Sequence, residues 1–211
     1  NERHEAWGSL ARKLAHEIKN PLTPIQLTLD RLKNKYSKEL DQNETDNFKD
    51  NLKIINNQIK QIEKLVNEFS DFARMPKPIF RENNLVNIIH ENINLLKELD
   101  NSIDISFKKD SEKIMLESDK EQISRVFLNL IKNSIESINQ KAQNNNIFSK
   151  KITIELTEDD SHIEVAIEDN GVGFSELKNN IKDILNPYFT TKKNGTGLGL
   201  SIVNKIINDH N

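Results

Sequence analysis

The stretch FKDNLKIINNQIKQIEKLVNEFSDFA, Phe48 to Ala73, decides how the first third of this chain folds. Its apolar residues recur every seven positions in two interleaved series, as in a helix that buries one stripe against a partner helix. The series are Phe48, Ile55, Ile62, Phe69 and Leu52, Ile59, Val66, Ala73. Asn43 precedes this run and is a candidate N-cap. The stretch therefore predicts a long helix that packs against another helix.

The segment before it carries the same heptad spacing. Its two series are Ala11, Ile18, Ile25, Leu32 and Trp7, Leu14, Pro21, Thr28. The polar connection YSKELDQNETDN separates the two segments, which together predict an antiparallel helical hairpin. A lone hairpin leaves part of each apolar stripe in water, and a second copy of the chain would cover it. We therefore predict a homodimer built as a four-helix bundle.

The signals alternate after the proline-rich stretch MPKPIF, Met75 to Phe80, which ends the hairpin. Helices are predicted for NLVNIIHENINLLKEL, for SDKEQISRVFLNLIKNSIESI with a Ser118/Glu121 capping box, and from about Thr196 onward. IDISF, KIMLE and the hairpin KITIELTEDDSHIEVAIED predict strands of a mainly antiparallel sheet. This second part is therefore expected to form an α+β sandwich.

The composition of the 211 residues narrows the classes of function. Lys and Arg (30) nearly balance Asp and Glu (33), so the net charge of -3 predicts no contact with nucleic acid or with a membrane surface within this segment. No cysteine is present, which excludes disulfides and thiolate chemistry. The chain has no initiator Met, signal peptide or long apolar run, so we expect a cytoplasmic piece of a longer protein.

The pair His16 and Glu17 lies in the first helical segment and suggests zinc at first sight. The zinc motif H-E-x-x-H has a histidine in its fifth position, but that position here is Asn20, a poor zinc ligand. His16 points about 180° away from the seam, so it should face solvent, as an ordinary surface histidine also would. The adjacent carboxylate favours a nucleophilic imidazole instead. Pro21 and Pro24 follow at once and predict a break or a bend.

Two further motifs are weak when each is taken alone. Asn129 and Asn133, in N-L-x-x-N, share a helix face, although both could be surface residues. Asp169, Gly171 and Gly173 follow a strand in EDNGVGF, where the glycines allow close backbone approach, although an ordinary turn has the same composition.

The stretch GTGLGLSIV has glycines at three alternate positions just before a helical run. Backbone N–H groups at such a helix start can approach phosphate. The spacing G-x-G-x-G and the absence of a preceding βαβ unit disfavour a Rossmann site, and no G-K-[ST] P-loop occurs.

The order of these motifs is more specific than any one of them. His-Glu-x-x-Asn-Pro, N-L-x-x-N, D-x-G-x-G, PYFTTK and G-T-G-L-G-L resemble the H, N, G1, F and G2 boxes of the sensor histidine kinases, over nearly the whole chain. HEIKNPLTPIQL is most similar to the NtrY-like subgroup of nitrogen regulation. The resemblance implies a dimerisation and phosphotransfer hairpin (residues 1–75), a linker (76–80) and a GHKL-type ATP-binding domain (81–211).

The resemblance also implies a role for each residue of the hairpin motif. His16 would be autophosphorylated, with Glu17 as its acid/base partner. Asn20 would position water when the protein acts as a phosphatase. The phosphoryl group would pass to an aspartate in the receiver domain of a response regulator, and a sensor anchored in the inner membrane would lie upstream.

In the second part, the resemblance implies an ATP site. Asn133 would hold Mg²⁺ on the ATP phosphates, with Asn129 supporting it. Asp169 would accept a hydrogen bond from the adenine amino group, and Gly171 and Gly173 would let the base approach.

Residues 175–194 would form a mobile lid in which Lys192 or Lys193 reaches the phosphates. The last nucleotide-binding positions would be Gly195, Thr196, Gly197, Leu198 and Gly199.

The resemblance also implies that about 25 residues of the ATP-binding domain are absent after Asn211. This departure keeps a second class of function open: a dimeric module that docks a response regulator, or only dephosphorylates it, without useful kinase activity.

Overall fold

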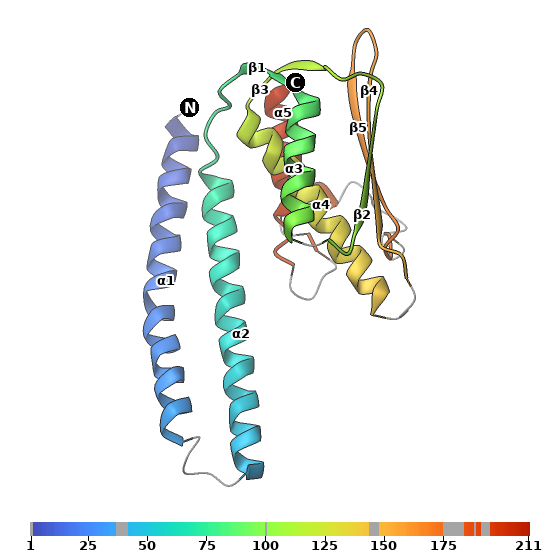
Figure 1. The fold of residues 1–211 in the computed structure, drawn as a ribbon. Helices are drawn as coiled ribbons and strands as arrows, with labels where there is room; N and C mark the ends of the chain where they lie inside the picture. Colours follow the sequence, from blue (N-terminus) through green and yellow to red (C-terminus); the bar gives the residue numbers. More distant parts are fainter. Residues whose placement is uncertain are drawn as a thin grey trace. The chain divides into compact units, whose positions relative to one another are not determined.

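The computed structural model describes residues 2–36, 42–99, 101–143, 148–174, 184–187, 189–190 and 195–211. The chain divides into two compact units, residues 1–76 with 190–198 and residues 77–189 with 199–211. The first unit contains two long helices, and the second contains three shorter helices with five strands in the part that is described (Figure 1).

The hairpin of the first unit consists of α1, Glu2–Tyr36, and α2, Gln42–Ala73. The predicted break in the first helix is wrong, because α1 runs unbroken through Pro21 and Pro24 (Figure 1). The hydroxyl of Thr28 donates to the Pro24 carbonyl at 2.8 Å. Packing along α2 outweighs the local cost of each proline, which lacks the N–H for one helical hydrogen bond.

Burial along the hairpin confirms one heptad series and corrects others. Leu52, Ile59, Val66 and Ala73 of α2 are all buried, as the spacing predicts. Among residues 10–36 of α1, Ala11, Ala15 and Leu22 are buried, whereas the predicted seam residues Leu14, Ile18 and Ile25 are more than 40% exposed. Asn43 lies inside α2 rather than at its N-cap, because the helix already begins at Gln42. A helix with two apolar stripes does not reveal from its spacing which stripe faces its own partner.

The second unit contains two small sheets. Strands β2 (Asp104–Lys109), β4 (Lys151–Glu158) and β5 (Ile163–Asp169) pair in the order β2-β4-β5, with β2 parallel and β5 antiparallel to β4. Strands β1 (Arg81–Asn84) and β3 (Met115–Ser118) form a separate antiparallel pair. The parallel pair and β1 are absent from the prediction, since RENN has no alternation of apolar residues.

Helices α3 (Leu85–Leu99), α4 (Lys120–Ala142) and α5 (Gly199–His210) lie on one side of the three-stranded sheet (Figure 1). Alternate residues of β4, Ile152, Ile154 and Leu156, are fully buried against α3 and α4. The prediction of a helical hairpin followed by an α/β sandwich is therefore confirmed. No helix in the described part of the chain combines the length and apolar character needed to cross a membrane.

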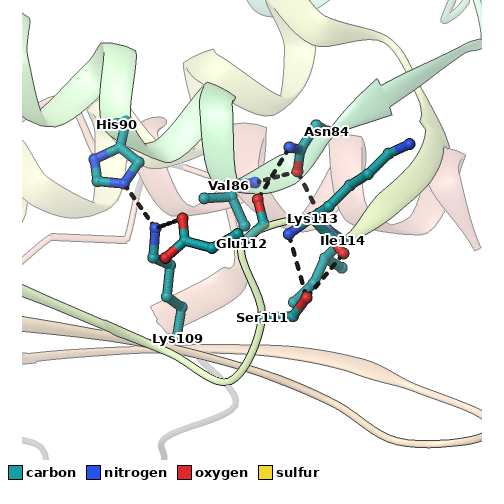
Figure 2. Close-up of polar contacts among 8 residues, drawn as sticks. All are labelled: Asn84, Val86, His90, Lys109, Ser111, Glu112, Lys113 and Ile114. Atoms are coloured by element: carbon teal, nitrogen blue, oxygen red, sulfur yellow. Dashed lines mark hydrogen bonds and ion pairs between the residues drawn. The ribbon is translucent and has the colours of Figure 1, made fainter.

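The side chain of Asn84 starts helix α3 and joins it to a distant turn (Figure 2). Its Oδ1 accepts from Val86 N at 3.1 Å, as an N-cap does, and from Ile114 N at 3.2 Å. Its Nδ2 donates to the Glu112 carbonyl at 3.3 Å. In the same turn Lys109 Nζ donates to Glu112 Oε2 at 2.6 Å, and this hydrogen bond, with the lysine charge, lowers the pKa of Glu112.

Helix α4 begins at a different cap from the predicted one. Ser118 is the fully buried last residue of β3, and Asp119 is the N-cap, accepting from the N–H groups of Glu121 and Gln122 at 3.0 Å each. The second carboxylate oxygen of Asp119 accepts from Ile79 N at 2.8 Å. Partial burial tends to raise the pKa of Asp119, but the three N–H donors together hold it below its usual value.

Candidate functional site

One face of α4 carries four polar residues at intervals of four, Asn129, Asn133, Ser137 and Lys141. Residues four apart lie one above the other on a helix, so these side chains form a polar ridge along α4. Asn129 and Asn133 are both half-buried, and Asn129 Nδ2 donates to the Arg125 carbonyl at 3.0 Å. Elsewhere α4 contributes apolar residues to the core, so the ridge is the polar side of a core helix.

The loop after β5 packs directly on this ridge at Ser137. A Cβ atom at Gly171 would lie 2.2 Å from Ser137 Oγ and 2.5 Å from its carbonyl carbon, so only glycine fits. Val172 N donates to the Ser137 carbonyl at 3.4 Å, and Gly171 N donates to Asp169 Oδ1 at 2.9 Å. Gly173 follows with φ +68°, the left-handed region that glycine adopts without strain.

Gly199, the first residue of α5, lies near Asn129 of the ridge. A Cβ at Gly199 would lie 3.5 Å from Asn129 Oδ1. Leu198 is fully buried, and Gly197 has φ +70°. Gly195 is half-buried. The structure therefore brings Gly199 close to Asn129 near the middle of α4, and Gly171 onto Ser137 two turns further along the helix.

Thr196 makes hydrogen bonds through its side chain. Its hydroxyl makes a short hydrogen bond to the Glu68 carboxylate of α2, within the first unit, and accepts from Leu198 N at 3.5 Å. Lys192 and Lys193, and most of the expected lid, lie outside the described residues.

The hairpin presents the other predicted group. His16, Glu17 and Asn20 are all exposed on α1. Ala15, which directly precedes His16, is only 5% exposed and belongs to the buried side of the helix. Asn20 follows His16 by one helical turn, which places both on the same side of α1. An exposed imidazole beside a carboxylate is accessible to a reactant that arrives from outside the helix.

Sequence reasoning missed Ser137, Lys141 and Asn170. The spacing of four that links Asn129 to Asn133 continues to Ser137 and Lys141, and this signal would have found both. No group of three or more His, Cys, Asp and Glu residues suited to a metal occurs among the described residues.

Two protein families match the chain. Residues 6–78 match the family described as "His Kinase A (phospho-acceptor) domain", and residues 118–211 match "Histidine kinase-, DNA gyrase B-, and HSP90-like ATPase". The two matches contain His16 and the α4 ridge, respectively.

Similar proteins cover almost the whole chain. It is 38% identical over 210 residues to a "Putative sensor histidine kinase NtrY-like" of Rickettsia conorii and 35% identical over 211 residues to "Nitrogen regulation protein NtrY" of Azorhizobium caulinodans. The matches cover 99% of the chain but only 33% and 26% of those relatives, so the chain spans about a third of their length or less.

Solved structures show the same arrangement of elements. The histidine kinase ThkA, in a crystal structure of its complex with the response regulator TrrA, is 30% identical, with a TM-score of 0.62 over 99% of this chain and 57% of that one. The catalytic domain of ThkA alone is 36% identical, with a TM-score of 0.52 over 63% of this chain and 82% of that one.

Proposed function

The chain belongs to the sensor histidine kinases of two-component systems, in their NtrY-like subgroup, and we propose that it uses ATP to phosphorylate its own His16. The observation that carries this proposal is the polar ridge of α4, with Gly199 packed near Asn129 and Gly171 packed on Ser137. Backbone from two glycine loops thus lies close to polar side chains of one helix, as a site that positions a nucleotide requires.

The base and the phosphates would bind at opposite ends of this ridge. Asp169 would accept from the adenine amino group, and Gly171 and Gly173 leave room for the base beside the chain. The phosphates would lie near Gly195, Gly197 and Gly199, because α5 begins at Gly199 and a helix N-terminus favours anions. Thr196 and Lys192 would join the phosphate contacts once the lid closes, which for Thr196 requires release from Glu68.

The residues present fit a magnesium ion held with the nucleotide. Mg²⁺ binds oxygen ligands and is usually held by one or two protein groups together with substrate phosphates and water. The Asn133 side-chain oxygen, half-buried on α4 one turn from Asn129, is such a ligand. When bound, the ion would neutralise phosphate charge.

The hairpin would supply the phosphoacceptor. An unprotonated nitrogen of His16 attacks the γ-phosphorus of ATP, the bond from that phosphorus to the bridging oxygen breaks, and ADP leaves. The imidazole then gives up its remaining proton to Glu17, and a phosphoramidate stays on His16. Asn20 would orient water when the same surface removes phosphate from a response regulator.

A second copy of the chain would complete the hairpin as a four-helix bundle. Both helices carry apolar residues that are at least 40% exposed, and these support the homodimer: they include Leu14, Ile18, Ile25, Ile54, Ile55, Ile62 and Leu65. Burying an apolar side chain of this size stabilises by about 1.5–3 kcal/mol, so this stripe favours association.

The phosphoryl group would pass to an aspartate in the receiver domain of a response regulator, and the similarity to ThkA, which was crystallised with TrrA, supports such a partner. We propose that residues 1–75 are the dimerisation and phosphotransfer domain, 76–80 the linker and 81–211 the ATP-binding domain. The linker would let the ATP-binding domain deliver phosphate to His16. This segment would lie on the cytoplasmic side of a sensor anchored in the inner membrane.

The test is incubation of the chain with Mg²⁺ and γ-labelled ATP. We expect acid-labile, base-stable label on the wild type and none on His16→Ala or Asn133→Ala. Asn133→Ala should also lose ATP binding, whereas His16→Ala should keep it. Label that persists on His16→Ala would refute the assigned acceptor. A wild-type chain that binds a receiver domain but never becomes labelled would instead be a docking module.

A further inference from the structure

The turn that carries Asp169 is held from two sides by groups outside the known motifs. From the sheet side, Asn170 N donates to the Lys151 carbonyl at 3.3 Å, and Asn170 Oδ1 accepts from Lys151 N at 3.0 Å. Asn170 Nδ2 also donates to the Ser149 carbonyl at 2.7 Å. These bonds extend the pairing of β5 with β4 by one residue, because Asp169 is opposite Ile152 in the ladder.

From the helix side, the last residue of the polar ridge reaches the same turn. Lys141 Nζ donates to the Asn170 carbonyl at 2.8 Å and lies 5.0 Å from the centre of the Phe148 ring. Both the lysine and the ring are half-buried, and a charged donor to a carbonyl is stronger than a neutral one. The ammonium group is therefore fixed between an aromatic face and the turn.

Both sets of hydrogen bonds affect the orientation of the Asp169 carboxylate. Asp169 is half-buried, and its Oδ1 is occupied by the Gly171 N–H. Its Oδ2 has no hydrogen bond to any residue in the described part of the chain. Since Asn170 lies between Asp169 and Gly171, any shift of its backbone changes the direction of Oδ2.

We propose that Lys141 and Asn170 are positioning residues that aim Asp169 Oδ2 at the amino group of adenine and so set the preference of the site for adenine. This inference rests on the proposed ATP site. Neither side chain touches the nucleotide; Lys141 acts through the Asn170 carbonyl, and Asn170 acts through the ladder bonds to Lys151 and Ser149. The selected ligand class is a purine nucleotide with a donor at its 6-position.

The experiment compares binding of ATP and of purine riboside triphosphate, which lacks the 6-amino group, to the full chain by calorimetry. Lys141→Met removes the charged donor and keeps an apolar stem of similar length. Lys141→Arg keeps a cation at the same place. Lys132→Met is the matched control, because Lys132 is an exposed lysine on α4 with no part in the turn. Thermal unfolding checks that each variant is folded.

For Lys141→Met we expect ATP affinity to fall about tenfold, the size of effect that loss of one charged hydrogen bond gives, with the purine riboside triphosphate unchanged. Lys141→Arg should restore most of the preference, and Lys132→Met should match the wild type. Asn170→Ala, which loses both side-chain bonds, should show the same selective loss. In an Asp169→Asn background, which keeps the acceptor for Gly171 N, Lys141→Met should add little.

Equal weakening of both nucleotides in Lys141→Met would assign the lysine to general stability and overturn the inference. Identical behaviour of Lys141→Met and Lys132→Met would also overturn it, while leaving the proposed function intact. A wild-type chain that binds ATP but does not prefer it over the purine analogue would remove the role of Asp169. A wild-type chain that binds neither nucleotide would refute the ATP site itself.

Discussion

The helical hairpin of the first unit and the second unit, called the sheet unit below, bury their apolar residues to different extents. The largest side chains with less than 2% exposure include Ile131, Ile154 and Ile206 of the sheet unit, and none of them belongs to α1 or α2 in the described ranges. In the hairpin, Ile18 and Ile62 remain 43% and 41% exposed. The sheet unit therefore encloses its own core, whereas the hairpin leaves apolar side chains exposed that the proposed second copy would cover.

Because of this difference, the proposed ATP binding and the proposed dimerisation depend on different units. Asn129, Asn133 and Asp169 of the proposed ATP site belong to the sheet unit, while the proposed phosphoacceptor His16 lies on helices whose stability should change with the concentration of the chain. The comparison predicts that the two units respond to different substitutions and different conditions.

The largest effect is expected in the core of the sheet unit. Ile154→Ala removes three carbon atoms from a fully buried side chain of β4 and should destabilise this unit by about 2–5 kcal/mol. The measurement is urea unfolding followed by loss of ATP binding. Glu155→Ala, on the solvent side of the same strand, should change stability little. A shift that depended on protein concentration would contradict the self-sufficient core.

The next effect concerns assembly. Ile62→Glu introduces a charge into the exposed stripe of α2 and should raise the dissociation constant of the dimer about a hundredfold, since each dimer loses two buried isoleucines. Analytical ultracentrifugation measures the change, and Asn67→Glu, an exposed position on the opposite side of the same helix, is the control. ATP affinity should stay the same. Unchanged association would show that this stripe does not form the dimer.

A smaller effect is expected at the turn after β5. Gly171→Ala places a methyl group against the backbone of Ser137, so the turn must shift, and ATP affinity should fall at least about tenfold. Gly173→Ala meets no atom within 4 Å and should cost only about 1 kcal/mol from its positive φ. Calorimetry with ATP separates the two. Equal losses would mean that backbone strain, rather than close packing, governs the turn.

The smallest effect is electrostatic. The pKa of Asp119 is lowered, so its contribution to stability is complete above the unfolded aspartate value of about 4 and is lost as pH falls through the lower folded value. Asp119→Asn should reduce the acid sensitivity of the sheet unit, whereas Asp160→Asn, in an exposed turn, should not. Thermal unfolding between pH 6 and pH 3 measures this; identical acid sensitivity in wild type and Asp119→Asn would rule out the cap as its source.

Regular spacing made most of the fold predictable from the sequence. The series Leu52, Ile59, Val66 and Ala73 predicted the buried side of α2, and period-two alternation predicted β4 and β5. Polar residues were less informative about where a helix begins. Ser118 and Asp119 are both good N-cap residues, and the pairing of Ser118 with Arg81 in the β1–β3 ladder decided between them.

The residues of the candidate site were also predictable only in part. Motif order named Asn129, Asn133, Asp169 and the glycines, and the structure brings Gly199 of α5 close to Asn129 of α4. The roles of these residues stay predictions. Lys141 carries no motif, and its contact with Asn170 depends on how α4 packs against the turn after β5, which a single sequence does not give.

The side chain of Asn84 has a consequence for the folding pathway. Its partners Glu112 and Ile114 are 28 and 30 residues away, yet the same amide caps the first turn of α3. The bond to Val86 can form locally, whereas the bonds to Glu112 and Ile114 form only when a loop of that length has closed. One amide side chain thus links a local helix cap to a long-range contact beside the β1–β3 pair.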